Sequence, residues 1–344
     1  MKKFSKLSCL IIGCGSIGER HVHNLKKLGV NNIAVYDTSK KKVNYLSNKY
    51  KTKKFYQLES TESFKPNFSI ICTYPSSHID LTNFCLDLNS HVFVEKPLSS
   101  NLRNVRKTLL KAKKRKLKIS VGYNLRFDKG INVLKNNIEK QKIGKPLSIF
   151  CQYGQHIKYW HPGTDYTQHY ILKKGGGIIL DDSHEYDYLR WILNDEPTHV
   201  YCQTKRTSNF RTQTESTALI NLKFRKGTIV TIMMDYLRPS YLRNCYILGE
   251  NGDITWTFTP NFSSSKLYHS KAISKVIINN NARKTKIETF SITANSTYID
   301  EMKNFLQSIL QNKKPTSDGF DAILTLKIGL AALRSAKLNK VIRI

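Results

Sequence analysis

The sequence is short of acidic residues, and it has no motif that would give its basic residues a nucleic-acid target. Only 25 Asp and Glu stand against 56 Lys and Arg, which leaves a formal net charge of +31. Such a charge attracts anions of many kinds and does not identify a function. The basic residues are mostly scattered lysines without a zinc-finger, RNA-recognition or heptad pattern. We therefore expect lysine-rich solvated faces and no specific nucleic-acid partner.

Paired cysteines and long apolar runs are also missing. The seven cysteines are widely spaced and contain no C-x-x-C pair, which argues against a disulfide framework and against a structural metal site. No stretch approaches 18 uncharged apolar residues, so we expect no membrane span. The apolar run at 7–12 is too short for the core of an export signal. These absences predict a cytoplasmic protein without a bound metal.

The composition has no enrichment in Pro (9) or Gly (17), which excludes a fibrous protein, and 344 residues suggest about two domains. In the first third, short apolar runs alternate with polar segments of helical length, a pattern that predicts βαβ units and a parallel sheet. The expected strands are 7–12, 33–36, 69–73, 91–94 and 118–122, with the clearest helices at 77–88 and 102–116.

After residue 122 the pattern changes to longer alternating segments, which predict an antiparallel sheet with helices. The expected strands are 147–155, 216–224, 228–236, 241–248 and 253–258, the expected helices are 127–141, 297–310 and 321–338, and the polar stretch 261–284 is expected to be rich in loops. The fold class is α/β plus α+β: a doubly wound parallel sheet followed by an open, mainly antiparallel sheet flanked by helices. We expect domains at 1–121 and 122–344, with the last helix packing back on the first domain.

A glycine-rich turn directly follows the first expected strand. It is a G-x-G-x-x-G made of Gly13, Cys14, Gly15, Ser16, Ile17 and Gly18. At the start of a helix, the backbone N–H groups of such a turn bind a pyrophosphate. The next strand ends at Asp37, nineteen residues past Gly18, where a carboxylate accepts hydrogen bonds from the adenosine ribose. The pattern predicts a Rossmann domain that binds NAD, while Ser39, Lys40 and Lys41 leave NADP open.

Two further strand ends carry polar residues at the same edge of the expected sheet. The third strand runs out through Thr73, Tyr74, Pro75 and His78, and the fourth through Glu95 and Lys96. Ligands bind outside the carboxyl ends of parallel strands, so we expect these residues beside the cofactor. His78 has a second interpretation, as a polar residue that only begins a helix. Because proline follows Lys96, the lysine is kept out of the α region and its side chain is aimed by the backbone.

The second half contains a candidate acid–base pair after the glycines at 175–177. If the segment that follows is helical, Asp181 and His184 share a face, so that the carboxylate could orient the imidazole. The alternative is a histidine that only stabilises the fold. Glu185 and Asp187 are expected to be helix-packing or solvent-facing acids.

A segment rich in aromatic and polar residues lies between the first strand of this half and the candidate pair. Aromatic faces combined with carboxylate, amide and imidazole groups suit a polyhydroxylated ring, although a buried aromatic cluster has the same composition. The residues that we expect to bind substrate are Tyr123, Arg126, Trp160, Asp165, Tyr166 and His184. For Arg126 a structural salt bridge is an equal alternative to an anionic group of the substrate.

Taken together, these motifs resemble the glucose-fructose oxidoreductase, inositol dehydrogenase and rhizopine catabolism (Gfo/Idh/MocA) family of nicotinamide oxidoreductases. The resemblance spans nearly the whole chain and implies that Lys96, Asp181 and His184 form a catalytic trio. Many members space the aspartate and histidine by four residues, and here that position is Leu180. The role therefore goes to Asp181, as in members with an Asp-x-Ser-His-Glu-x-Asp segment, with Asp182 as the alternative.

The resemblance also implies the kind of substrate and the assembly. The expected reaction is hydride transfer between the cofactor and a hydroxyl carbon of a sugar, nucleotide sugar or cyclitol. The loop around Trp160 is similar to that of members in surface-glycan pathways. Because members commonly bury the open sheet against a second subunit, we expect a homodimer or homotetramer.

Other classes fit the sequence less well. The pair Tyr170 and Lys174 has the spacing of a short-chain dehydrogenase, but Lys174 runs directly into three glycines and not along a helix. A zinc alcohol dehydrogenase needs clustered Cys and His ligands, which are absent from the sequence. A cofactor-binding sensor without activity would have no need of Lys96 and His184. A nucleic-acid-binding regulator is suggested by the charge alone.

Overall fold

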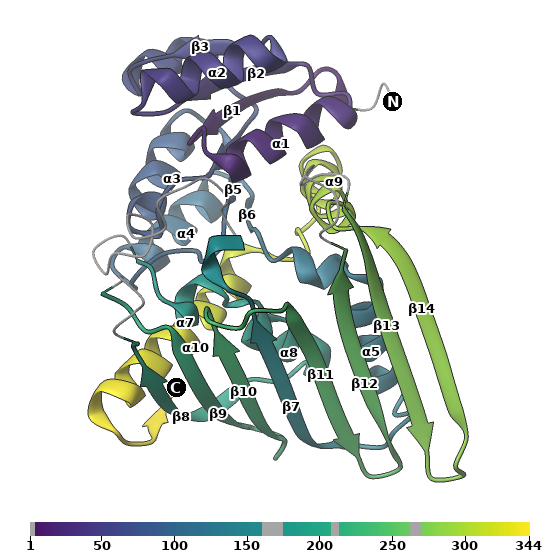
Figure 1. Ribbon diagram of the computed structural model, residues 1–344. Coiled ribbons are helices and arrows are strands. Elements are labelled where there is room, and N and C mark those ends of the chain that lie inside the picture. Colours follow the sequence, from purple (N-terminus) through teal and green to yellow (C-terminus); the bar gives the residue numbers. More distant parts are fainter. Residues whose placement is uncertain (1–3, 160–174, 208–212, 262–269) are drawn as a thin grey trace. The chain divides into compact units, whose positions relative to one another are not determined.

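The computed structural model describes residues 4–159, 175–207, 213–261 and 270–344. The chain forms two compact units, drawn in Figure 1. Unit 1 comprises Met1–Tyr123 and Tyr298–Ile323, and unit 2 comprises Asn124–Thr297 and Leu324–Ile344. Each unit is built around its own sheet. In the described part of the chain, no helix is long and apolar enough to cross a membrane.

Unit 1 contains a six-stranded, wholly parallel sheet in the order β3-β2-β1-β4-β5-β6. The strands are β1 (Ser8–Ile12), β2 (Asn32–Tyr36), β3 (Lys53–Phe55), β4 (Phe68–Ile71), β5 (His91–Val94) and β6 (Ile119–Val121). The helices are α1 (Ser16–Lys27), α2 (Lys40–Tyr50), α3 (His78–Asp87), α4 (Val105–Lys114), α9 (Ser296–Leu310), which lies almost entirely in this unit, and the start of α10 (Gly319–Leu338). The strand order reverses between β1 and β4, which is where doubly wound sheets bind their ligands.

The central strands of unit 1 are mostly apolar because helices cover both faces of the sheet. All five residues of β1 are buried, and β4 is buried along its whole length. The rings of Phe68 on β4 and Phe93 on β5 pack against Phe305 of α9, with centroids 5.9 and 5.7 Å apart. The segment 296–310, distant in sequence, thus completes the core of the first unit.

Unit 2 is built on a nine-stranded sheet in the order β14-β13-β12-β11-β7-β10-β9-β8-β15. Neighbouring strands are antiparallel except β7 and β10, which run parallel. The strands are β7 (Pro146–Gly154), β8 (Pro197–Lys205), β9 (Thr217–Phe224), β10 (Ile229–Asp235), β11 (Leu242–Gly249), β12 (Gly252–Pro260), β13 (Lys271–Asn280), β14 (Thr285–Thr293) and β15 (Ile342–Arg343). Residues 225–228 join β9 to β10, and residues 250–251 join β11 to β12.

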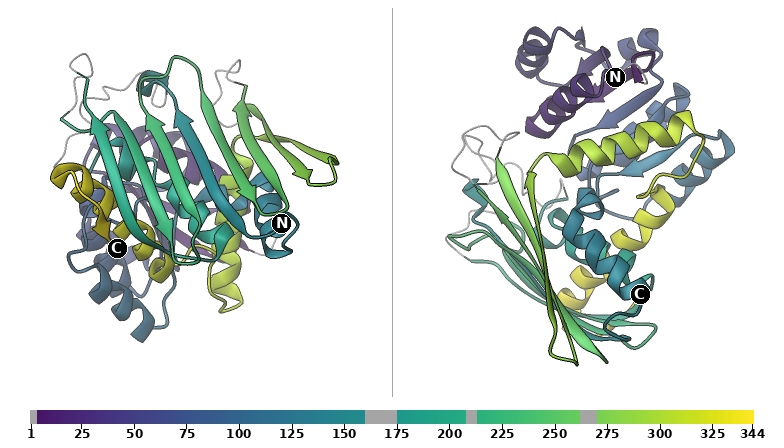
Figure 2. Two further views of the ribbon diagram at one scale, coloured as in Figure 1. Left: turned by 90° about the horizontal axis from the view of Figure 1, so that it is seen from below. Right: turned by 90° about the vertical axis from the view of Figure 1, so that its right-hand side faces the viewer.

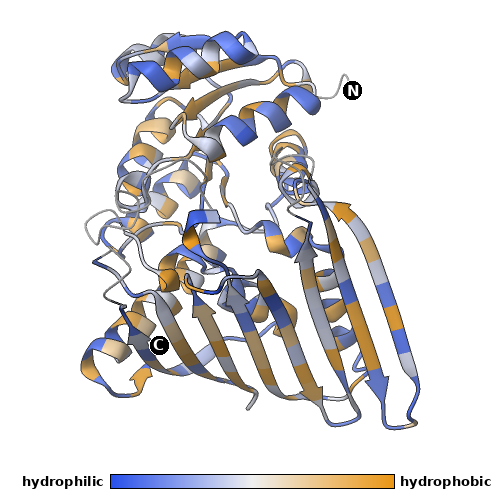
Figure 3. Cartoon of the chain, in the orientation of Figure 1, coloured by the Kyte–Doolittle hydropathy of each residue, from blue (hydrophilic) through white to orange (hydrophobic). Residues whose placement is uncertain are grey.

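Helices cover one face of this sheet, as Figure 2 shows: α5 (Lys129–Glu139), α7 (Ile178–Asp181), α8 (His184–Leu193) and the end of α10. The strands alternate accordingly, with every second residue of β9 buried, and Figure 3 shows the alternation along β14. The core contains Trp256, Tyr188 and Ile247. No helix among the described residues covers the other face.

The fold class is confirmed: a doubly wound parallel sheet and a mainly antiparallel sheet with helices. Two details of the expected pattern were wrong. The stretch 261–284 was expected to be rich in loops, but it contains β13. The alternating residues Ala272, Ser274 and Val276 of this strand are buried against the helices, although the stretch as a whole is polar. The strands β3, β8 and β14 were not anticipated, and two of the three residues of β3 are lysines.

Candidate active site

The three glycines of the turn after β1 have different structural roles. A Cβ on Gly13 would lie 2.5 Å from the carbonyl oxygen of Cys72, and its φ of +102° also favours glycine. A Cβ on Gly18 would lie 2.0 Å from the carbonyl oxygen of Gly13. At Gly15 no heavy atom of the described residues lies within 4 Å of such a Cβ. Gly13 and Gly18 therefore close the turn, and Gly15 leaves open space at the start of α1.

This open space fits a pyrophosphate. No side chain caps α1, whose N-cap is Gly15, so the N–H groups of its first turn are not used by a capping side chain. Ser16 and Ile17 begin the helix at that point. A helix N-terminus of this kind binds phosphate oxygens, and the cradle matches what NAD requires.

Asp37 follows β2 at the same edge. Its Oδ2 accepts a hydrogen bond from the backbone N–H of Cys14 at 2.7 Å, and its Oδ1 accepts one from Ser39 at 2.8 Å. The carboxylate is therefore held in place against the glycine turn. Each oxygen keeps a further lone pair, which is what a ribose diol needs.

The segment after β4 is held by its own hydrogen bonds. The hydroxyl groups of Thr73 and Ser77 are 2.8 Å apart, and Tyr74 and Pro75 lead into the 3-10 turn Pro75–Ser77. His78 is fully buried, and its Nδ1 and Nε2 lie 2.9 and 3.1 Å from the carbonyl oxygens of Pro97 and Thr73. Burial lowers the pKa of His78, although both contacts oppose the shift. The imidazole thus joins the segments after β4 and β5.

Lys96 follows β5, and its neighbour Glu95 is buried and held by a hydrogen bond. Glu95 Oε1 accepts a hydrogen bond of 2.7 Å from Nε2 of His21, a fully buried residue of α1. Burial alone would raise the pKa of Glu95, but the hydrogen bond and charge of His21, together with the charges of Lys96 and Arg20, lower it. A charged carboxylate therefore lies directly before the candidate catalytic lysine.

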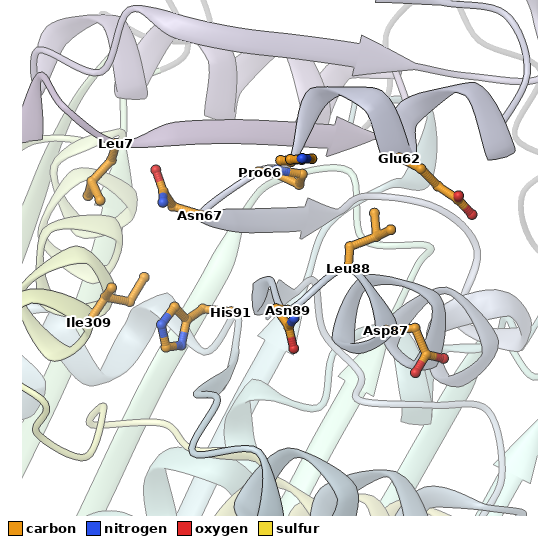
Figure 4. A pocket seen from close by; sticks show the side chains of 10 residues that line it. Leu7, Glu62, Pro66, Asn67, Asp87, Leu88, Asn89, His91 and Ile309 are labelled. Atoms are coloured by element: carbon orange, nitrogen blue, oxygen red, sulfur yellow. The ribbon is translucent and has the colours of Figure 1, made fainter.

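A cavity of about 550 Å³ in unit 1, shown in Figure 4, lies at the opposite edge of the sheet. Its lining includes Leu7 before β1, Asn67 before β4 and His91 at the start of β5. These are the amino ends of the strands. Doubly wound sheets bind their ligands at the carboxyl ends, so this cavity is not part of the candidate site.

In unit 2 the segment that carries Asp181 and His184 is not one helix. Asp181 is the last residue of α7, and His184 is the first of α8. At Asp182, between them, the backbone has φ −105° and ψ 53°, which breaks the helix. The condition for a shared face, one continuous helix through both residues, is therefore not met. Asp181 instead accepts a hydrogen bond of 2.9 Å from the hydroxyl of Tyr236, which directly follows β10.

A buried ion cluster explains the break. Nη2 of Arg243, on β11, lies 2.8 and 2.9 Å from the two carboxylate oxygens of Asp182, and its Nε lies 2.9 Å from Oε1 of Glu185. The guanidinium also stacks 4.0 Å from the ring centroid of Tyr153 on β7. Burial raises the pKa of Glu185 well above its usual value; Arg243 opposes the rise and Asp182 adds to it. The residues on both sides of His184 are thus attached to the sheet.

A second arginine holds the next turn of α8. Nε and Nη2 of Arg126 donate hydrogen bonds of 2.8 and 2.7 Å to the two carboxylate oxygens of Asp187. Both side chains are 2% exposed, so the structure contains the structural salt bridge. Tyr123, three residues earlier and in unit 1, is fully buried. Glu185 and Asp187 are buried as well, so the solvent-facing alternative for them was wrong and the helix-packing alternative was right.

Gly177 and Glu215 fix the start of the same segment. A Cβ on Gly177, whose φ is +108°, would lie 2.3 Å from Oε1 of Glu215. The same oxygen accepts a hydrogen bond of 3.2 Å from the backbone N–H of Ile179. Burial raises the pKa of Glu215 to about 7, against hydrogen bonds from the backbone that lower it. The glycines at 175–177 therefore make room for a carboxyl group that caps α7.

Three expected substrate residues, Trp160, Asp165 and Tyr166, lie outside the described residues, as do Tyr170 and Lys174. Several partners of the site were not predicted from the sequence: His21, Glu215, Tyr236 and Arg243. Tyr236 ends an expected strand in a position like that of Asp37, and this signal could have found it. Nothing in the sequence marks the other three, because each reaches its partner from a distant element.

The parallel sheet, the glycine cradle and Asp37 define an NAD-binding Rossmann domain, and with the candidate acid–base residues they indicate the class of NAD-dependent oxidoreductases. The chain belongs to the Gfo/Idh/MocA oxidoreductase family. The family model described as "Oxidoreductase family, NAD-binding Rossmann fold" matches residues 7–123, and the model of the family's C-terminal domain matches residues 131–255.

Known proteins resemble the chain along nearly its whole length. Myo-inositol 2-dehydrogenase of Thermotoga maritima is 26% identical over 348 residues, covering 96% of this chain and 98% of that protein. An oxidoreductase from Agrobacterium radiobacter, solved in complex with NAD⁺, L-tartaric acid and magnesium, has a TM-score of 0.82 at 19% identity, covering 98% of both chains. The WlbA dehydrogenase from Bordetella pertussis, in complex with NADH and UDP-GlcNAcA, has a TM-score of 0.81 at 17% identity, covering 98% of this chain and 99% of that one. The two structures show a shared fold.

Proposed function

We propose that this protein transfers hydride between NAD and a hydroxyl-bearing carbon of a sugar, nucleotide sugar or cyclitol, with Lys96, Asp181 and His184 as its catalytic residues. The single observation that carries the proposal is the position of Lys96. It follows β5 at the edge of the sheet where the glycine cradle and Asp37 also lie. Doubly wound sheets bind their ligands outside the carboxyl ends of the strands, and Lys96 lies at that edge.

Each residue has a distinct role in this proposal. A bound NAD, held at the start of α1 and by Asp37, would supply the acceptor for the hydride of the carbinol carbon. The imidazole of His184 takes the hydroxyl proton, because histidine is the side chain that most often acts as a general base. The ammonium of Lys96 donates a hydrogen bond to the same oxygen and stabilises its developing negative charge. Asp181, held by Tyr236, orients the polar groups around the hydroxyl.

Four variants test these roles. His184→Ala and Lys96→Met should each lose at least about a hundredfold in turnover while keeping their affinity for NADH, measured by fluorescence titration. Asp181→Asn should lose turnover too, and Asp182→Asn should mainly lower the melting temperature because its carboxylate pairs with buried Arg243. Near-normal turnover in His184→Ala would remove that residue from the mechanism. The reverse pattern for the two aspartates would move the role of Asp181 to Asp182.

Two relatives support the proposed substrate class, one through a cyclitol and one through a nucleotide sugar. The Thermotoga protein is named for myo-inositol, and the Bordetella structure contains a nucleotide sugar. A thermal-shift screen with NAD(H), NADP(H), myo-inositol, scyllo-inositol and UDP-linked sugars separates the possibilities. We expect a shift with NAD, and a larger one when NAD is combined with a single polyol or nucleotide sugar. If no nicotinamide cofactor shifts the melting temperature, the proposed function is wrong.

We further propose that two or four copies associate through the uncovered face of the sheet in unit 2. The exposed apolar side chains on that face are Phe150, Leu219, Ile229, Tyr246, Leu248, Ile273 and Ile287. An apolar face of this extent is unusual on a monomer, and most oligomers of soluble proteins are symmetric. Light scattering after gel filtration should report a dimer or tetramer, and Phe150→Lys with Tyr246→Lys should give monomers. A monomeric wild-type protein would contradict this proposal.

The cysteines support a reducing compartment, and we propose the cytoplasm. All seven are free and buried. Burial raises the pKa of the Cys85 and Cys202 thiols to about 12, so these thiols stay protonated and unreactive at neutral pH. Fractionation of the native cells with an antibody should recover the protein with cytoplasmic markers, and its recovery with secreted proteins would oppose the proposal.

A further inference from the structure

His21 is a buried histidine that the proposed chemistry does not use. It lies on α1, two turns past the glycine cradle, and its side chain is fully inaccessible. Its ring packs edge-on against Phe93 of β5, with centroids 5.3 Å apart, and its Nε2 is 2.7 Å from Oε1 of Glu95. The helix that begins at the cradle is thus tied to the residue directly before Lys96.

The carboxylate of Glu95 has little freedom to move. On the side away from His21 it lies against Gly122, where a Cβ would be 3.0 Å from Oε2. The side chain of Glu95 is only 11% exposed. The titratable and charged groups that face this carboxylate are Arg20 and His21 on α1, Cys72 after β4, His78 on α3 and the neighbouring Lys96. Among them, His21 makes the short hydrogen bond.

The peptide on the other side of Lys96 is held separately. Nδ1 of His78 lies 2.9 Å from the carbonyl oxygen of Pro97. Each neighbour of the lysine is therefore attached to a buried imidazole, Glu95 through its carboxylate and Pro97 through its carbonyl oxygen. His78 holds a carbonyl, whereas His21 holds a charged group whose field acts on the lysine ammonium itself.

We propose that His21 is a positioning residue, which keeps Glu95 ionised and in place and thereby holds Lys96 charged and aimed for catalysis. The inference rests on the proposed function only in taking Lys96 as catalytic. Without a donor from His21, the buried carboxylate takes up a proton, since an unpartnered charge is costly in that position. Lys96 then loses a neighbouring negative charge, and its ammonium gives up its proton more easily.

Chemical labelling of the full-length protein tests this without activity. The rate at which acetic anhydride modifies Lys96 at pH 8, read by mass spectrometry of its peptide, reports the fraction of neutral amine. His21→Leu should raise that rate about threefold to tenfold, because one unit of pKa changes the neutral fraction tenfold. His21→Gln, which keeps a donor near Nε2, should stay within twofold of the wild type.

His91→Leu is the matched control, because His91 lies at the far end of the same strand and its Nδ1 accepts from Lys118. It should leave Lys96 labelling unchanged. Glu95→Gln should reproduce the effect of His21→Leu, and the double variant should add nothing further. If His21→Leu does not fold, Glu95→Gln alone decides. The positioning role would be overturned if Lys96 labelling stayed within twofold of the wild type in His21→Leu or, where that variant does not fold, in Glu95→Gln. Additive effects on labelling in the double variant would also overturn it.

Turnover separates this inference from the proposed function. With the substrate found in the thermal-shift screen, His21→Leu should lower kcat about tenfold with little change in the affinity for NADH, and His21→Gln should restore it. In a Lys96→Met background His21→Leu should have no further effect on kcat. Full turnover in Lys96→Met would remove the catalytic role of the lysine. The labelling experiment would still test whether His21 keeps Lys96 charged, because it does not depend on turnover.

Discussion

The two units hold their candidate catalytic residues in different ways. In unit 1 the polar residues follow strands of a parallel sheet whose core is apolar. Two buried histidines hold the segment of Lys96, His21 through Glu95 and His78 through the carbonyl oxygen of Pro97. In unit 2 His184 follows a break in a helix, and two buried arginines pair with the acids around it. Strand ends position the first site through the backbone, and buried ion pairs position the second through side chains. Removal of a single charged side chain should therefore lower the free energy of unfolding more in unit 2 than in unit 1.

The largest effect is expected for Arg243→Met. The substitution leaves Asp182 and Glu185 buried without their cation, and breaking a buried pair in this way costs about 3–5 kcal/mol of the free energy of unfolding. Urea denaturation measures the loss. Lys286→Met is the control within the same unit, because Lys286 is 71% exposed in its pair with Glu288, and its loss should cost less than about 1 kcal/mol. Equal losses in the two variants would show that the buried pairs of Arg243 stabilise unit 2 no more than an exposed pair does.

A smaller effect is expected from the glycine turn of unit 1, where backbone geometry dominates. Gly18→Ala places a methyl group against the carbonyl oxygen of Gly13 and should cost about 1–3 kcal/mol. Gly15→Ala meets open space and should change stability by less than about 0.5 kcal/mol. It should nevertheless weaken NADH binding at least tenfold, because the methyl group occupies the place of the pyrophosphate. Thermal melts and fluorescence titration of both variants test this, and tight NADH binding by Gly15→Ala would argue against the cradle.

The smallest effect concerns pH. The pKa of Glu215 is about 7 in the folded protein and near 4.5 in an unfolded chain. The folded state therefore binds this proton more tightly, and the carboxyl group costs stability progressively as the pH rises from about 4.5 through 7. Glu215→Gln keeps an acceptor for the N–H of Ile179 and should be more stable than the wild type by about 1–2 kcal/mol near pH 6, with little difference at pH 4.5.

Melting curves across that range test the prediction, with Glu59→Gln, an exposed residue of unit 1, as the control. A constant difference between Glu215→Gln and the wild type at every pH would show that Glu215 does not titrate as expected.

Local pattern was a good guide wherever a single segment carries its own signal. The glycine turn and the strand ends at Asp37 and Lys96 were predicted because each needs particular residues at adjacent positions. The strand β13 was missed because Lys271, Ser274 and Lys275 make it polar, while its buried face is covered by α5. The break at Asp182 was missed because the sequence there is compatible with a helix. Its cause, Arg243, lies 61 residues away.

By itself the sequence determined the class of the two sheets, the nucleotide-binding turn and the residues that could carry the chemistry, since these depend on periodicity and on short motifs. The tertiary structure alone decided which buried charges have partners: His21 with Glu95, Arg243 with Asp182 and Glu185, and Tyr236 with Asp181. The physical reason is that a buried polar group is stable only when a partner reaches it, and the partner can come from any element that folding brings close.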